Sequence, residues 1–389
     1  MKFISLFLLI TLAISFVYLP TILFYYQLEN EASNEKIFFG VSFGGNTASQ
    51  AKLLIDKVKG YTNFFLINNW DIALNETTLT EISQYAIDAN LSIMVYYDLI
   101  PYKNQTWIQP WFDTAKERWG DQFLGVYLYD EPGGKQIESG QWRSGPTAEK
   151  LFVNVSDYSD AANRFTTAIP SSEFMQFVKY NSLSVFTSDF ALYWFDYLAG
   201  YDSVFVELGW DHNRTQHIAL GRGAANVQEK DWGAIIVWKS QDPEDEDKGV
   251  YKTGPEMLQD MLVAYQAGAK YVIVFNYPYE QPFGILEEEH FAAMETFWNK
   301  IRSPQQGSLE KVEGEVAFVL PKDYGWGMRT PNDNMWGIWE ADNRSQLIWD
   351  NMNKLIERYG LKLDIIYDDA RFSFEQKYSK IYLWNATDY

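Results

Sequence analysis

The chain has no cysteine and only three histidines among its 389 residues, and both shortages exclude kinds of site. Without cysteine it can form no disulfide, no zinc–thiolate centre and no thiol nucleophile. The histidines, His212, His217 and His290, are too scattered in the sequence to predict a metal cluster, so we expect no metal and no cofactor. The formal net charge of -20 argues against binding nucleic acid, because the phosphates would be repelled.

Aromatic residues, by contrast, are abundant. They make up 17% of the chain and include 15 tryptophans. This density suits a large core, and surplus rings often line sugar-binding clefts by stacking on the C–H faces of sugars. The chain length suits one α/β barrel of about 250 residues together with a smaller second unit.

The N-terminal segment 3–28 carries no charged side chain. At 1.5 Å per residue a helix of that length crosses a bilayer. Because no Ala-x-Ala site follows, we predict an uncleaved signal-anchor helix over 1–28 and a polar spacer over 29–35; a cleaved signal peptide is the alternative. Lys2 precedes the segment and Glu29 follows it, so the positive-inside rule predicts a single-pass membrane protein with its bulk outside the cell.

Sequons agree with an exterior location. Such sites matter only in a chain that meets a glycosylation machinery. An acidic, cysteine-free, sequon-rich chain with one anchor is similar to archaeal surface proteins. N-glycans are expected at Asn75, Asn90, Asn104, Asn154, Asn213, Asn343 and Asn385.

Apolar runs of strand length alternate with helical patterns throughout 36–302. Eight strand–helix repeats in about 270 residues predict a (β/α)8 TIM barrel, although the count is open by one strand at the fifth and sixth positions. We expect a functional loop over 133–146 and then helix over 147–180, interrupted at Pro170. The predicted strands are 36–43, 64–68, 92–97, the run before Asp130, 183–187, 203–207, 233–238 and 271–275.

A second, smaller unit follows the barrel. The polar segment 303–314 is predicted to be a linker. Beyond it, 315–389 is expected to form a small flavodoxin-like α/β unit, with a Trp-rich loop after its first strand. The predicted elements are strands at 315–320, 362–367 and 380–384 and a helix over 344–359.

Two adjacent carboxylates, Asp130 and Glu131, end the fourth run before Pro132, Gly133 and Gly134. Because chemistry in an α/β barrel is done at the carboxyl ends of the strands, both are candidate catalytic residues. The alternative is a structural role, since an acidic residue before proline commonly opens a helix.

Glu207 ends an otherwise apolar strand. Burying a lone carboxylate is costly unless it is used or paired, which favours a catalytic role. The alternative is an ion pair with Arg214, Arg222 or Lys239. Other polar and aromatic residues at expected strand ends are predicted to bind substrate: Asn69, Trp70, Tyr97, Asp98, Asp189, Trp210, Lys239, Asn276 and Tyr277.

The run Tyr127-Leu128-Tyr129-Asp130-Glu131-Pro132 resembles the fourth-strand segment of clan A glycoside hydrolases, which ends in Asn-Glu-Pro. The resemblance implies that Glu131 is the acid/base and that Asp130 stands where the family has an Asn that holds the sugar 2-hydroxyl. A barrel followed by a flavodoxin-like unit is also similar to β-galactosidases of that clan.

The sequence departs from this clan at strand seven, where the nucleophilic Glu is expected but Trp238 is followed by Lys239. Either Glu207 has the second role, or the strand count is shifted, or catalysis is lost. Pairing of strands four and six resembles families in which an Asp at strand four is the nucleophile, which would make Asp130 the nucleophile and Glu207 the acid.

Together these patterns favour an enzyme that hydrolyses glycosidic bonds with Glu131 and Glu207, with Asp130 beside them. The separation of the two carboxyl groups would decide retention or inversion. The alternative is a catalytically inactive barrel that binds glycans or acts as a cell-surface structural protein.

Overall fold

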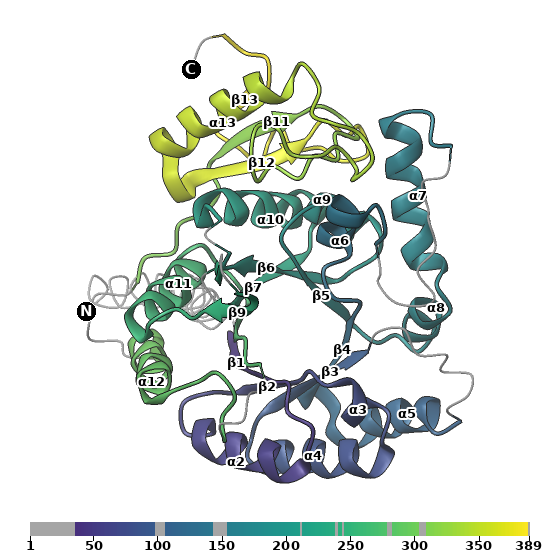
Figure 1. Ribbon diagram of the computed structural model, residues 1–389, viewed down its shortest axis with the longest axis vertical. Coiled ribbons are helices and arrows are strands. Elements are labelled where there is room, and N and C mark those ends of the chain that lie inside the picture. Colours follow the sequence, from purple (N-terminus) through teal and green to yellow (C-terminus); the bar gives the residue numbers. More distant parts are fainter. Residues whose placement is uncertain are drawn as a thin grey trace, which may run out of the picture. The chain divides into compact units, whose positions relative to one another are not determined.

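Eight parallel strands close into a barrel in the computed structural model, in the order β1-β10-β7-β6-β5-β4-β3-β2 (Figure 1). The structure describes residues 36–97, 106–142, 154–210, 212–237, 240–242, 245–277, 282–302 and 309–387. The predicted TIM barrel is confirmed, with no shift in the strand count. The strands are β1 Phe38–Phe43, β2 Phe64–Ile67, β3 Ser92–Tyr97, β4 Phe123–Leu128, β5 Val185–Asp189, β6 Ser203–Leu208, β7 Asp231–Ile236 and β10 Tyr271–Val274.

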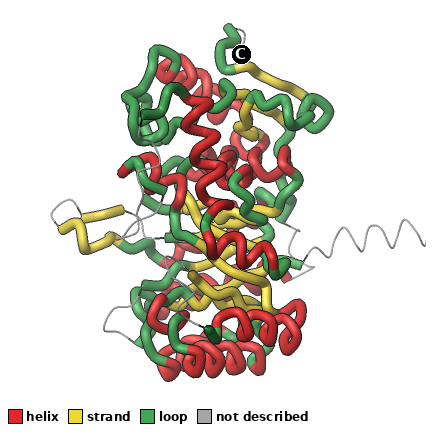
Figure 2. The backbone as a smooth tube through the Cα atoms, turned by 90° about the vertical axis from the view of Figure 1, so that its right-hand side faces the viewer, coloured by secondary structure: helices red, strands yellow, loops and turns green. Residues whose placement is uncertain are grey.

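Helices lie around the outside of the barrel (Figures 1 and 2). In the first of them the buried residues Ala51, Leu54, Ile55 and Val58 recur every three or four positions, the spacing of one helical face. The helices are α2 Ala48–Val58, α3 Trp70–Ala73, α4 Glu76–Asp88, α5 Ile108–Trp119, α6 Pro132–Ser139, α7 Tyr158–Ser171, α8 Glu173–Tyr180, α9 Tyr193–Leu198, α10 Arg214–Gln228, α11 Gly254–Gln266 and α12 Glu288–Arg302.

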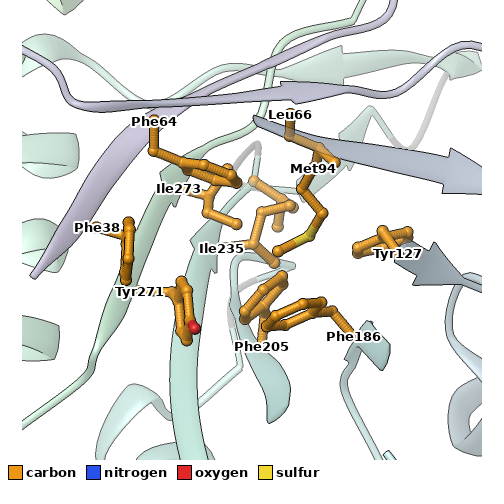
Figure 3. Close-up of a cluster of buried hydrophobic side chains, with 11 residues drawn as sticks. Phe38, Phe64, Leu66, Met94, Tyr127, Phe186, Phe205, Ile235, Tyr271 and Ile273 are labelled. Atoms are coloured by element: carbon orange, nitrogen blue, oxygen red, sulfur yellow. The ribbon is translucent and has the colours of Figure 1, made fainter. Parts of the chain in front are cut away.

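The inside of the barrel is filled by large side chains rather than left open. Rings and aliphatic side chains from the strands meet there, among them Phe186 of β5 and Phe205 of β6, whose ring centroids lie 5.8 Å apart (Figure 3). Because side chains alternate along a strand, the residues two positions later, Ser188 and Glu207, also face the interior, one layer nearer the carboxyl ends of the strands.

A smaller parallel sheet, in the order β12-β11-β13, follows the barrel in the sequence. Helix α10 contacts both β6 of the barrel and β12 of this sheet. Two glycines allow this: an added Cβ would lie 2.2 Å from Val206 at Gly221 and 2.6 Å from the Ile365 oxygen at Gly223. The elements are β11 Val316–Leu320, α13 Ser345–Tyr359, β12 Leu363–Tyr367 and β13 Lys380–Leu383.

Two local predictions differ from the structure. The expected loop 133–146 instead begins with helix α6, which has Pro132 in its first turn. The expected helix 147–180, interrupted at Pro170, is two helices that meet at Ser172; residues 154–157 are not helical, and 147–153 lie outside the described residues. Farther along the chain, β8 Ser240–Asp242 and β9 Asp245–Val250 form an antiparallel hairpin, which projects to one side in Figure 2.

The expected single-pass membrane localisation is also corrected. Across the part of the chain that the structure describes, every helix is too short or too polar to cross a bilayer. The predicted anchor and spacer, 1–35, lie outside the described residues. Neither anchoring nor N-glycosylation gains support from the structure.

Candidate active site

The candidate site begins at the sharp turn that joins β4 to α6. Tyr129 and Glu131 both have left-handed backbones, with φ of 53° and 52°. A non-glycine residue in that region costs about 1–2 kcal/mol, and such strain tends to gather at functional sites. Backbone hydrogen bonds hold the turn. The N–H of Glu131 donates to the backbone oxygen of Ser188 at 3.1 Å, and the N–H of Lys135 donates to the backbone oxygen of Glu131.

Asp189, the last residue of β5, fastens the same turn from behind. Its carboxylate accepts hydrogen bonds from the backbone N–H groups of Gly133 at 2.6 Å and Gly134 at 2.8 Å, which are the orphan donors at the start of α6. It also accepts from the N–H groups of Phe190 and Ala191. Glu131 is the N-cap residue of α6, as the structural alternative expects, but its side chain makes no capping hydrogen bond. The side chain of Asp189 accepts the capping hydrogen bonds instead.

Glu207 lies on β6 at the same edge of the barrel. Its side chain is only 3% exposed. One carboxylate oxygen accepts a hydrogen bond from the Ser188 hydroxyl at 2.7 Å, and the other accepts from the indole N–H of Trp210 at 3.3 Å. Trp210, like the turn after β4, has a left-handed backbone, with φ of 55°.

Ion pairing does not account for Glu207. Arg214 pairs with Asp260 at 2.8 Å, and Arg222 pairs with Asp364 at 2.7 Å. Lys239, the third cation considered, lies outside the described residues. Among the side chains that the structure describes, Glu207 has hydrogen-bond donors but no cation as partner.

A buried phenol connects the two strands. The hydroxyl of Tyr127, on β4, lies 2.6 Å from Asp130 Oδ1 and 2.7 Å from the Ser188 hydroxyl. Since Ser188 also reaches Glu207, the exposed and the buried carboxyl groups belong to one hydrogen-bonded chain. Asp130 is 41% exposed, and Glu131 is 25% exposed.

Two carboxyl groups of this site, those of Glu207 and Glu131, resist ionisation. Burial, together with the negative charges of Asp130 and Asp189, raises the pKa of Glu207 to about 8, against the hydrogen bonds from Ser188 and Trp210. Burial also raises the pKa of Glu131 well above its ordinary value, with Glu207 and Asp130 adding to the effect. A proton is therefore held within the cluster at neutral pH.

One cation lies beside the two exposed acids. The ammonium group of Lys135 is 3.6 Å from Asp130 Oδ2 and 3.9 Å from Glu131 Oε2, and it donates a hydrogen bond to the Asp130 backbone oxygen. Its charge lowers the pKa of Glu131, in opposition to burial. Lys135 is four residues after Glu131 on α6, so the same helix carries the acid and its partial counter-charge.

Three of the predicted substrate-binding residues have structural partners instead. The Asn69 side chain caps α3, accepting from the Ile72 N–H and donating to the Gly44 oxygen. Tyr97 is fully buried between the barrel and its helices and donates to the Ala73 oxygen. The Asn276 side chain accepts from the Ile285 N–H and is 4% exposed.

The other predicted contacts differ in accessibility. Trp70 is half-buried at the first position of α3, and Tyr277 is 45% exposed after β10. Asp189 is fully buried, and four backbone N–H groups occupy its oxygens, so it positions the turn rather than contacting a substrate. Asp98 and Lys239 lie outside the described residues.

Sequence reasoning missed Ser188 and Tyr127 as members of the site. Ser188 lies two residues after the interior residue Phe186, so strand alternation was the available signal for it. Tyr127 is also interior, but a register shift between β3 and β4 interrupts the alternation before it. The more useful signal is a polar side chain at an interior position near the end of a strand, as at Ser188. Over the described ranges, no group of His, Asp and Glu side chains is arranged to hold a metal ion.

No protein-family model and no curated protein matches this chain. Among solved structures, a β-galactosidase from Bacillus circulans sp. alkalophilus has a TM-score of 0.57 and 10% identity, with 90% of this chain and 67% of that chain covered. The GH20 modules of the pneumococcal exo-β-D-N-acetylglucosaminidase StrH have a TM-score of 0.41, 9% identity and coverages of 71% and 89%. A 3-hexulose-6-phosphate synthase has a TM-score of 0.37, 11% identity and coverages of 67% and 98%. At these identities the likeness shows the fold alone.

Proposed function

We propose that this chain hydrolyses glycosidic bonds, with Glu131 and Glu207 as the two carboxyl groups that the reaction requires. The observation that supports this most is the hydrogen-bonded path through Tyr127 and Ser188, which joins Glu207 on β6 to Asp130, the residue beside Glu131 at the end of β4. Cleavage of a glycosidic bond needs one carboxyl group to protonate the leaving oxygen and a second to attack the sugar or activate water.

Glu131 is the proposed general acid/base. It is accessible to a substrate, and burial together with neighbouring negative charge raises its pKa, so it can hold a proton at neutral pH and give it to the leaving oxygen. Glu207 is the proposed second carboxyl group. Hydrogen bonds from Ser188 and Trp210 favour its charged form, but burial outweighs them and raises its pKa to about 8, so Glu207 must release a proton before it attacks the sugar or activates water.

The remaining residues are proposed to bind the sugar. Asp130 would hold a hydroxyl group beside the scissile bond, and the rings of Trp70, Trp210 and Tyr277 would stack on sugar faces. Asp98 and Lys239 remain proposed contacts. The parallel order β12-β11-β13 is that of the first three strands of a flavodoxin-like sheet, and the β-galactosidase similarity in fold agrees with a carbohydrate-active barrel.

A second assignment of roles makes Asp130 the nucleophile and Glu207 the acid. Exposure favours it, because Asp130 is 41% exposed and Glu207 only 3%. The two assignments differ sharply for Asp130→Asn, which restores the Asn of the clan A motif. Under the first assignment this variant keeps most of its activity; under the second it loses a nucleophile.

The test is hydrolysis of a panel of aryl glycosides by the wild type, Glu131→Gln and Asp130→Asn. We expect Glu131→Gln to lower kcat/KM by about 10²–10⁴-fold, because general acid catalysis contributes about that much. The loss should be smallest for substrates whose leaving groups need no proton. Circular dichroism checks that each variant folds. A folded Glu131→Gln variant with unchanged turnover on every substrate would refute the role of Glu131.

The second candidate function is carbohydrate binding without cleavage. The burial of Glu207, which is 3% exposed, favours this candidate, because a catalytic carboxyl group must reach the sugar. Calorimetric titration with oligosaccharides tests this. Heat of binding without any released product, in the wild type and in Glu131→Gln alike, would favour this candidate over the hydrolase.

A further inference from the structure

We propose that Tyr127 and Ser188 form a proton relay that connects the buried carboxyl group of Glu207 with the exposed carboxyl group of Asp130. The three contacts along this path are 2.7 Å from Glu207 to Ser188, 2.7 Å from Ser188 to Tyr127 and 2.6 Å from Tyr127 to Asp130. Each is a normal length for a hydrogen bond between oxygens, so the path has no gap. Only the catalytic use of the relay rests on the proposed function.

A relay is needed because Glu207 cannot reach solvent itself. Its side chain is 3% exposed, and Ser188 is 2% exposed. Tyr127 is 1% exposed, its ring packed in the barrel interior (Figure 3). Asp130, at the other end, is 41% exposed. A buried acid that must gain or lose a proton in each catalytic cycle requires a path of this kind.

The proton transfer balances along the path. When Glu207 is protonated, the Ser188 hydroxyl turns from Glu207 towards Tyr127. Glu207 Oε1 then gives its proton to the Ser188 oxygen, the Ser188 proton passes to the Tyr127 oxygen, and the Tyr127 proton passes to Asp130 Oδ1. Three O–H bonds break and three form, and the negative charge moves from Asp130 to Glu207. The reverse transfer recharges Asp130, so neither hydroxyl is consumed.

Charged and polar groups lie beside both ends of the path. Lys135, 3.6 Å from Asp130, favours a negative charge at the exposed end. The Trp210 N–H favours one at the buried end. Other titratable groups act on the path or its ends: Glu131 in the turn after β4, Asp189 on β5 and Tyr193 on α9.

The test measures exchange of the Glu207 carboxyl proton for deuterium, without substrate. The infrared carbonyl band of protonated Glu207 is identified by its absence from Glu207→Gln, and its shift is followed after rapid mixing with D2O, at a pH well below the Glu207 pKa. Tyr127→Phe and Ser188→Ala each remove one hydroxyl of the path. We expect each to slow the exchange at least about tenfold, the effect of roughly 1.4 kcal/mol on a barrier.

Tyr197→Phe is the matched control. Tyr197, like Tyr127, is a buried tyrosine, but its hydroxyl donates to the backbone oxygen of Asp231 and is not part of the path. It should leave the exchange rate unchanged. Exchange at the wild-type rate in either path variant would overturn the relay, and so would equal slowing in Tyr197→Phe. The exchange is measured without substrate, so it does not depend on the proposed function. If the two path variants slow the exchange while the wild type cleaves no glycoside, the relay stands and the proposed hydrolase activity is rejected.

Discussion

The carboxylate of Asp189 accepts a 2.6 Å hydrogen bond from the backbone N–H of Gly133, so the last residue of β5 holds the first turn of α6. That turn directly follows Glu131, whose backbone is left-handed. A fully buried acid on one strand thus orients the candidate catalytic acid on the next, without needing to touch a substrate itself.

Removing the Asp189 carboxylate should therefore destabilise the fold. Asp189→Ala leaves four backbone N–H groups without their acceptor, and we expect the free energy of unfolding to fall by at least about 2 kcal/mol. Asp189→Asn keeps one carbonyl oxygen and should lose less. Urea unfolding measures both; equal stability of Asp189→Ala and the wild type would show that the turn is held by other contacts.

Stability should depend on pH through Glu207. Burial raises its pKa to about 8 from 4.5, so between these values the folded chain keeps a proton that the unfolded chain releases. The free energy of unfolding should then fall as the pH rises through this window, by up to about 1.4 kcal/mol per pH unit for this group.

The matched variant is Glu207→Gln, which has no proton to exchange at this position. Urea unfolding of both proteins across the window isolates the effect of Glu207, because other raised groups such as Asp189 remain in both. We expect the wild type to lose stability relative to the variant as the pH rises. Parallel curves would mean that Glu207 ionises as easily in the folded chain as in the unfolded one.

The ion pair between Arg222 and Asp364 joins α10 to β12, at 2.7 Å with exposures of 2% and 0%. Arg222→Met leaves a buried carboxylate without its cation, which should lower the free energy of unfolding by about 3–5 kcal/mol. Lys362→Met is the control: Lys362 and Glu315 are 53% and 51% exposed in their pair, so its loss should cost less than about 1 kcal/mol. Similar losses for the two variants would contradict the importance of burial.

One substitution should stabilise the chain. Glu229 ends α10 with φ of 56°, and its side chain is 84% exposed. Glu229→Gly removes the steric cost of a left-handed backbone, so the free energy of unfolding should rise by about 1 kcal/mol. Glu357→Gly, at an exposed position inside α13, should lower it by about the same amount. Thermal unfolding compares them, and a lower Tm for Glu229→Gly would refute the prediction.

The barrel could be predicted because most of its strands are short apolar runs with both faces buried, such as β2. β3, predicted at 92–97, has those bounds in the structure. Helix α6 was missed for a physical reason: Gly133 and Gly134 are poor helix formers, yet the helix requires them. An added Cβ would lie 2.5 Å from the Ala191 oxygen at Gly133 and 2.3 Å from the Phe190 ring at Gly134. Close tertiary packing overrides the local propensity.

Apolar periodicity and the carboxylates at the ends of two runs were enough to predict an α/β barrel with Asp130, Glu131 and Glu207 at one edge. The hydrogen-bonded chain through Tyr127 and Ser188 was decided only by the closed sheet, because these residues are 61 positions apart in the sequence. Alternation along a strand says which side a residue faces, whereas the register between β4 and β5 decides which hydroxyl it meets. That register is a property of the packed barrel, and no local pattern encodes it.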